Sequence, residues 1–134
     1  MTKAKQQYYY GLGRRKSATV RARLTSGKGH ITVNDKPAEE YFAKDEQLLW
    51  RIQQPFVAVS LEGKYDVSLR ASGGGMSGQV DAATLAISKA LAELNDDLRS
   101  TLKRAGFNKR DPREKERKKF GLKRARKKEQ YSKR

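Results

Sequence analysis

Lysine and arginine are the chemically active side chains that this sequence offers in quantity. The 134-residue chain has 31 Lys or Arg and 15 Asp or Glu, which gives a net charge of +16. The last 32 residues, from Lys103 to Arg134, hold 16 of the basic and 4 of the acidic residues, a balance of +12. Cations at this density neutralise phosphates, so the predicted partner is nucleic acid. An anionic membrane surface or an acidic protein is the other kind of partner that such charge allows.

The sequence lacks the residues that catalysis, metal binding and membrane insertion usually need. The sequence has no cysteine and a single histidine, His30, so disulfides, thiolate catalysis and the usual transition-metal sites are excluded. There is no Ser/His/Asp or Cys/His set, and we expect neither an enzyme nor a cofactor. No apolar run approaches the ~18 residues of a membrane span, and the start, MTKAKQQYYY, lacks the apolar core of a signal peptide. The chain is therefore expected to be soluble and cytoplasmic.

The first basic cluster follows three consecutive tyrosines at residues 8–10. It consists of Arg14, Arg15 and Lys16, with Gly11 and Gly13 just before it. Aromatic residues favour a strand, and the glycines favour a bend or a close backbone approach. We expect the tyrosines to pack on the core, although they could instead stack on bases while the cations meet phosphates. In so basic a chain, the cluster is predicted to contact RNA rather than to be merely solvated.

Residues 17–25 have the clearest strand pattern. Small and apolar side chains alternate with polar ones, so Arg21 and Arg23 should lie on one face, about 7 Å apart, close to the phosphate spacing of a nucleic-acid strand. A simply solvated face would have the same pattern. A glycine-containing turn and a second alternating run at residues 30–33 predict an antiparallel hairpin. We expect His30 to be an ordinary residue at the strand edge.

The middle of the chain predicts short helices and a second hairpin. Residues 37–42 and 45–53 are helical in pattern, with Asp45 as the N-cap. Pro55 is expected to end the second helix, and residues 56–61 and 65–69 to pair as strands. Trp50 is expected to pack in the core, with stacking on a base as the alternative.

A glycine-rich loop then leads into the longest predicted helix. Gly73, Gly74, Gly75 and Gly78 lie between the strand and a helix over residues 79–95, whose apolar stripe predicts packing on the sheet. Free N–H groups at such a helix start can bind phosphate, and a tight turn that brings helix and sheet together explains the glycines equally well. A second helix over residues 98–104 should end at Gly106.

The charge distribution divides the chain into two parts. Residues 1–106 are predicted to form the globular body, and residues 107–134 an extended basic tail with too few apolar groups to fold alone. A helix start is predicted at Asp111, and residues 122–134 could reach roughly 40 Å.

Several ordered motifs resemble the small-subunit ribosomal protein nine family, of the bacterial type. They are the opening at residues 9–17, the glycine signature at residues 73–91, the run Arg104-Ala105-Gly106-Phe107, the tail segment at residues 116–126 and the ending Gln130-Tyr131-Ser132-Lys133-Arg134. Two departures are Leu12, where the family has a small polar residue more often, and Tyr131, where Phe is commoner. The resemblance implies a compact α+β domain of about four mostly antiparallel strands with helices on one face. It is similar to the second domain of small-subunit ribosomal protein five and includes a left-handed β-α-β crossover.

The resemblance also implies the partners. These are the 3′ major domain of small-subunit ribosomal RNA in the head, neighbouring head proteins, and the anticodon stem-loop of P-site transfer RNA, which the tail tip contacts. The tRNA-binding residues implied are Tyr131, Ser132, Lys133 and Arg134. Charge and resemblance together predict these rRNA-binding residues: Arg14, Arg15, Lys16, Arg21, Arg23, Gly73, Gly74, Gly75, Ser77, Gln79, Arg104, Lys109, Arg110, Arg113, Arg117, Lys118, Lys119, Lys123, Arg124, Arg126 and Lys127. A free RNA-binding module and a phosphotransferase using the glycine loop are the competing hypotheses.

Overall fold

The computed structural model describes residues 8–107, 109 and 120 of the 134. Five strands form one sheet in the order β1-β2-β5-β3-β4. The elements, in chain order, are β1 (Tyr9–Arg15), β2 (Ala18–Ser26), β3 (Ile31–Val33), β4 (Lys36–Pro37), α1 (Ala38–Tyr41), α2 (Glu46–Ala58), β5 (Tyr65–Ser72), α3 (Met76–Leu94) and α4 (Asp96–Ala105).

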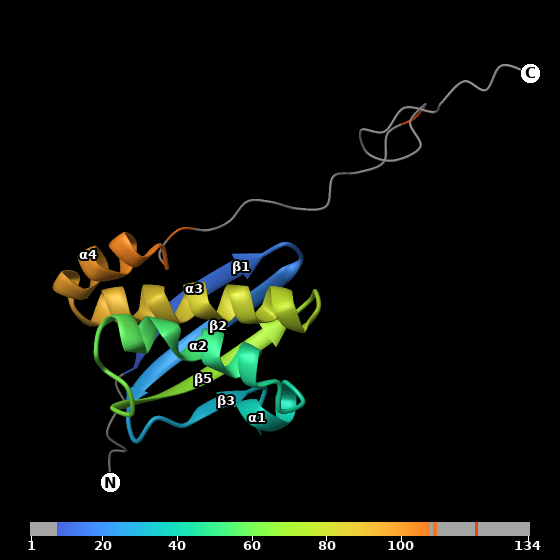
Figure 1. Ribbon diagram of the computed structural model, residues 1–134, viewed down its shortest axis with the longest axis horizontal. Helices are drawn as coiled ribbons and strands as arrows, with labels where there is room; N and C mark the ends of the chain where they lie inside the picture. Colours follow the sequence, from blue (N-terminus) through green and yellow to red (C-terminus); the bar gives the residue numbers. More distant parts are fainter. Residues whose placement is uncertain (1–7, 108, 110–119, 121–134) are drawn as a thin grey trace, which may run out of the picture.

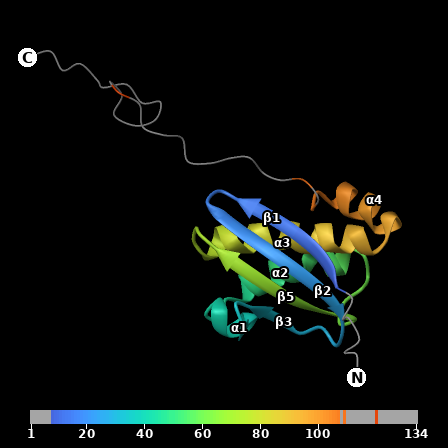
Figure 2. The same cartoon turned by 180° about the vertical axis from the view of Figure 1, so that it is seen from behind.

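The sheet has one covered and one open face. α2 and α3 lie across one face, and no helix in the described part crosses the other (Figures 1 and 2). The predicted α+β class with helices on one face is confirmed, with five strands where about four were expected. Among the described residues, no helix combines the length and hydrophobicity needed to cross a membrane.

The β-α-β crossover between β3 and β5 has the rarer of the two possible handednesses. These strands are parallel neighbours, and the chain passes between them through α1 and α2 on the covered face. Viewed from that face with both strands pointing up, β5 lies to the left of β3 (Figure 1). The crossover is therefore left-handed, as the resemblance implied, against the strong preference for right-handed connections.

The first predicted hairpin is wrong in its pairing. Residues 30–33 do form a strand, but β3 pairs with β5 in parallel, and β2 pairs antiparallel with β1 and β5. The Asn34 side chain contributes to this arrangement, because its amide exchanges two 3.0 Å hydrogen bonds with the backbone N–H and C=O of Ala71. The long strand β5 thus inserts between two segments that follow each other in sequence.

The second predicted hairpin is also wrong. Residues 56–58 continue α2 past Pro55, and only residues 65–72 form a strand. Ile52 and Phe56 are buried one helical turn apart, which makes the helix the better way to bury this short apolar run. Pro55 cannot donate to the Arg51 carbonyl. The Thr84 hydroxyl of α3 lies 3.4 Å from that oxygen and 2.9 Å from the Val80 carbonyl, so its one hydrogen is shared between the two acceptors.

Two predicted helix boundaries, the N-cap at Asp45 and the stop at Gly106, are confirmed. The Asp45 carboxylate accepts hydrogen bonds from the N–H groups of Gln47 and Leu48, which caps α2. α4 ends at Gly106, which has a φ of 83°, and the Phe107 N–H donates to the Leu102 carbonyl. Phe107 packs against the core, one residue beyond the boundary expected after residue 106. The division into body and tail stays a prediction.

α3 lies very close to the sheet because β1 has glycines beneath it. A Cβ on Gly11 would overlap the carbonyl oxygen of Ala86, and one on Gly13 would overlap that of Ala82. Ala82, Ala86 and Ala90 are fully buried in this contact. The close backbone approach that the sequence indicated is therefore confirmed at both glycines.

A carboxylate of β5 holds the loop between β2 and β3. Asp66 Oδ1 accepts the backbone N–H groups of Lys28, Gly29 and His30 at 3.0, 3.0 and 2.9 Å. The hydrogen bond from His30 is the largest cause that lowers the pKa of Asp66 below its ordinary value, and those from Lys28 and Gly29 act in the same direction.

We predict that Gly13→Ala destabilises the fold severely, by about 3 kcal/mol or more, because α3 must move off the sheet. Urea unfolding followed by circular dichroism measures the change. Gly75→Ala is the matched control, because a Cβ there has nothing within 4 Å and the φ of −99° suits alanine. Equal stability of the two variants would contradict the close packing as described.

We predict that Asp66→Asn destabilises the fold in a pH-dependent way. Because the folded-state pKa lies below the unfolded value of 3.8, ionised Asp66 stabilises the fold fully above that value. The stabilisation is lost as the pH falls through the folded-state pKa. Unfolding free energies of wild type and variant should differ by a constant amount near neutrality and converge in acid. Glu62→Gln, in an exposed loop, is the control for the loss of one negative charge, and an equal destabilisation by it would contradict the role of Asp66.

Candidate nucleic-acid interface

The open face of the sheet is the first cationic surface. Ala18, Val20, Ala22 and Leu24 of β2 are buried, and Arg21 and Arg23 between them are exposed on the opposite side. This is the face expected from the alternating sequence. Cross-strand pairing places Arg14 beside Thr19 and Arg21 beside Arg70. Strands β1, β2 and β5 thus each contribute at least one arginine to this side of the sheet. Figure 2 shows these three strands from the side that the helices leave uncovered.

The tyrosines divide between the two faces. Tyr9 packs partly against the core, as expected. Tyr8 and Tyr10 are 50% and 42% exposed, so the expectation of core packing is wrong for these two. The guanidinium of Arg23 lies 5.1 Å from the centre of the Tyr8 ring, a cation–π contact, and Tyr10 is the cross-strand partner of Arg23. Both exposed rings are therefore next to a cation.

The glycine-rich loop packs against the turn between β1 and β2 at one end of the sheet (Figure 1). Gly73 and Gly74 have φ values of 73° and 62°, and a Cβ on either would crowd Ser17 or Ala18. The tight-turn explanation of these glycines is thus supported. Gly75 caps α3 without a side-chain hydrogen bond, and Ser77 and Lys16 are exposed nearby. Phosphate binding at this end stays a prediction.

Gln79 points inward. Its side chain is largely buried, its Oε1 accepts from the Tyr41 hydroxyl at 2.8 Å, and its Nε2 donates to the Gly73 carbonyl at 3.0 Å. Both ends of the amide therefore have partners inside the protein. Gln79 thus holds the glycine-rich loop against α1, and its predicted RNA contact stays a prediction.

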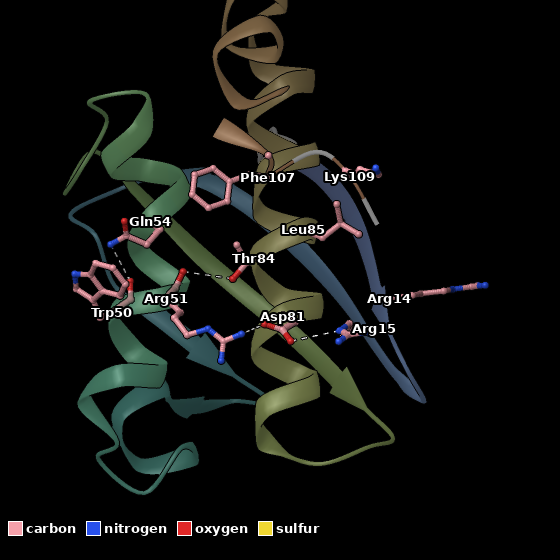
Figure 3. Close-up of a pocket in the computed structure, with 11 residues that line it drawn as sticks. Arg14, Arg15, Trp50, Arg51, Gln54, Asp81, Thr84, Leu85, Phe107 and Lys109 are labelled. Atoms are coloured by element: carbon pink, nitrogen blue, oxygen red, sulfur yellow. Dashed lines mark hydrogen bonds and ion pairs between the residues drawn. The ribbon is translucent and has the colours of Figure 1, made fainter. Parts of the chain in front are cut away.

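The second cationic surface is a cleft of about 570 Å³ on the helical side (Figure 3). β1 contributes Arg14 and Arg15, α2 contributes Trp50 and Arg51, and the segment after α4 contributes Phe107 and Lys109. Four cationic side chains thus line the cleft together with one carboxylate, that of Asp81. An anion or a phosphate-rich polymer is the ligand that suits this lining.

Asp81 connects three elements of the cleft. Its carboxylate, on α3, forms an ion pair with Arg51 of α2 and lies 3.5 Å from Nε of Arg15 on β1 (Figure 3). The Arg15 side chain is only 13% exposed, and that of Arg51 is 38% exposed. The carboxylate therefore holds Arg15 in place and leaves part of the Arg51 guanidinium accessible from the cleft.

Trp50 corrects another expectation from the sequence. It was expected in the core, but it is 63% exposed at the border of the cleft. In α2, the buried side chains are those of Ile52, Pro55 and Phe56, and the helical period turns Trp50 to the outside. The alternative role, stacking on a base, is compatible with its exposure.

The remaining predicted residues divide by position. Arg104 is exposed in the last turn of α4, and Lys109 is exposed beside the cleft. The other C-terminal residues lie outside the described residues. They are Arg110, Arg113, Arg117, Lys118, Lys119, Lys123, Arg124, Arg126, Lys127, Tyr131, Ser132, Lys133 and Arg134, together with the helix start predicted at Asp111.

Sequence reasoning missed Arg51, Arg70 and the pairing role of Asp81. Arg70 could have been found, because the alternation of residues 65–69 continues through Ser72 and puts it on the cationic face. Nothing in the sequence indicates that Arg51 and Arg15 meet at Asp81, since the arginines are 36 residues apart and lie 30 and 66 residues before the acid. In the described part of the chain, no group of three or more His, Cys, Asp or Glu could hold a metal ion.

Comparison with known proteins gives one consistent result. The family described as ribosomal protein S9/S16 matches residues 13–134. The small ribosomal subunit protein uS9 of Solidesulfovibrio magneticus is 52% identical over 128 residues, covering 96% of this chain and 98% of the relative. The uS9 proteins of Lawsonia intracellularis and of Synechococcus sp. strain JA-2-3B'a(2-13) are 51% and 48% identical, over 96% and 100% of this chain and 98% and 100% of the relatives.

We predict that Asp81→Asn destabilises the fold by about 1 kcal/mol at low salt, because two arginines lose their shared counter-charge at a partly exposed site. The loss should shrink at high salt, which screens the remaining repulsion. The same variant should bind a polyanion such as heparin more tightly, because it removes the carboxylate of the cleft.

Glu62→Gln is the control, because it removes one negative charge away from the cleft. If Glu62→Gln changes stability and heparin binding as much as Asp81→Asn does, then net charge and not the cleft is responsible.

Proposed function

Because the chain belongs to the ribosomal protein S9/S16 family, we propose that it is a structural constituent of the small ribosomal subunit. In this proposal the body binds small-subunit ribosomal RNA in the head, and the C-terminal segment contacts the anticodon stem-loop of P-site transfer RNA. Neighbouring head proteins are further partners, on the cytoplasmic ribosome. The family is one of structural ribosomal proteins, so no reaction is assigned.

The observation that carries the proposal is the extent of the family match. It runs from Gly13 through Arg134 and so includes most of the body and the segment that holds +12 of the net charge. A free RNA-binding module has no need for the ordered motifs of the whole family. The relatives are matched over nearly their full length as well.

The geometry supports RNA as the partner of the body. Arginines on the open face and in the cleft project from strands and helices of a packed core, and such rigid placement fixes where phosphates must lie. Exposed Tyr10 and Trp50 offer flat rings beside these cations. Phosphate contacts of this kind position an RNA and stabilise its fold without reading its sequence.

The C-terminal cations have a different task in the proposal. Arg110, Arg113, Arg117 and the later basic residues would follow the RNA backbone outward from Lys109. Tyr131, Ser132, Lys133 and Arg134 would meet the transfer RNA, with the arginine fork suited to bidentate contact with a phosphate. Anchoring thus depends on the body, and transfer-RNA contact on the last four residues.

The test of residence is sedimentation of tagged protein from a lysate at moderate and at high salt. We expect the full chain to migrate with small subunits at both salts, and a version that ends at Phe107, the last residue that packs on the core, to do so as well. A full chain that stays at the top of the gradient, or leaves the subunits at modest salt, would identify loose polyanion binding instead.

We predict that Lys133→Ala with Arg134→Ala weakens the retention of P-site transfer RNA several-fold without reducing incorporation into subunits. Two charge-assisted phosphate contacts are lost, while the anchoring body is unchanged. Lys115→Ala with Lys128→Ala removes the same charge from the segment outside the tip and is the matched control. Equal transfer-RNA affinity of the two double variants across a salt series would refute the role of the tip.

A further inference from the structure

Four side chains form a compact block on the open face of the sheet. Thr19 pairs with Ser72, and Arg21 pairs with Arg70, in the antiparallel register of β2 and β5. Residues two apart on a strand share a face, so the two hydroxyls and the two guanidinium groups all lie on the side away from the helices. They surround a shallow hollow of about 330 Å³, completed by Asn34 and Ala71. No carboxylate is among its lining residues.

One of the two arginines is fixed by a carboxylate outside the hollow. Nη1 and Nη2 of Arg70 each donate to an oxygen of Asp35, at 2.9 and 3.0 Å. A guanidinium group has five N–H donors, so three remain for another acceptor. Asp35 is held in turn by the β3–β4 hairpin, in which Asn34 and Asp35 both have positive φ and Asn34 is hydrogen-bonded to Ala71. The hairpin therefore places Arg70 and limits its conformations.

The other arginine has no ion-pair partner among the described residues. Arg21 is exposed between Leu12 on β1 and Arg70 on β5, its cross-strand neighbours. Like charges directly opposite each other on a sheet destabilise it. An anion bound between Arg21 and Arg70 removes that repulsion, and the hydroxyls of Thr19 and Ser72 add neutral donors beside it.

We propose that this block, Thr19, Arg21, Arg70 and Ser72, binds a backbone phosphate of an RNA strand that lies across the open face of the sheet. The inference rests on the proposed function for the identity of the RNA. It adds Arg70, Thr19 and Ser72 to the interface and assigns them one ligand group, a phosphodiester.

The surroundings of the block favour a polymer over a small anion. The hollow is open, and the cationic face continues on both sides of it, to Arg14 beside Thr19 and to Arg23 two residues beyond Arg21. Exposed Tyr10 pairs with Arg23, so the cationic face also carries an aromatic ring on which a base could stack. A free phosphate would contact the block alone, whereas an RNA strand contacts the whole row.

The test compares Arg21→Gln with Arg70→Gln against a charge-matched control, Lys89→Gln with Arg99→Gln. The control residues are exposed on α3 and α4. Full chains are titrated with a single-stranded RNA oligonucleotide at several salt concentrations, and their incorporation into small subunits is measured in parallel. Thermal melts verify the folds, and the sheet variant should melt no lower than the control, because it loses only a surface pair and gains relief from repulsion.

The expected result is an affinity for the oligonucleotide about tenfold below that of the control, with a slope against log salt that is smaller by about 0.7–0.9, the value for one phosphate contact. Affinity and slope equal to those of the control would overturn the phosphate site. Equal affinity combined with poor incorporation of the sheet variant would also overturn it and identify a protein as the partner of this face.

If wild type itself fails to enter subunits, the proposed function is wrong, and the oligonucleotide titration still decides the site. Competition by inorganic phosphate as strong as by the oligonucleotide would show that the site takes the free anion and not RNA.

Discussion

The contact between α3 and the first two strands is the constraint on which the rest of the structure depends. Gly11 and Gly13 expose bare backbone to the carbonyls of Ala86 and Ala82, and the small side chains of the helix complete the fit. Such a contact allows the helix only one depth and one rotation on the sheet. It turns Asp81 toward Arg15 and Arg51, and thereby arranges the cleft. Because the whole helical layer lies on this side, the arginines of the other face stay uncovered.

Local signals in the sequence predicted the local structure well. The alternation of β2, the cap at Asp45 and the stop at Gly106 depend only on neighbouring residues, and each is confirmed. The two predicted hairpins failed because pairing is not local. Nothing near residues 30–33 indicates that β5 separates them from β2. A short apolar run after Pro55 fits a strand or a buried helix equally, and contact with α3 decided for the helix.

The residues of the candidate site also divide into those that local sequence patterns predict and those that they do not. Charge and alternation were enough to find Arg14, Arg21 and Arg23, because exposure follows from strand period and polarity. Trp50 was misplaced, since side-chain size predicts burial only on average and the rotation of α2 settles the single case. Arg51, Arg70 and Asp81 acquire their roles from neighbours that are distant in sequence. Only tertiary structure brings such groups together.

The body presents cations on both sides of one thin sheet, and the edge strand β1 connects them. Arg15 faces the helices and lines the cleft, whereas Arg14, the next residue back, lies in the row with Thr19 and Ser72 and also reaches the cleft border. Two adjacent residues of an edge strand thus serve both surfaces, because in the part of the chain that the structure describes no further strand pairs with β1. Under the proposed function, an RNA that folds around this edge would contact both faces. Cations fixed on both faces of one sheet would hold two RNA segments at a set separation. Such a role suits a structural protein better than a protein that recognises an RNA sequence.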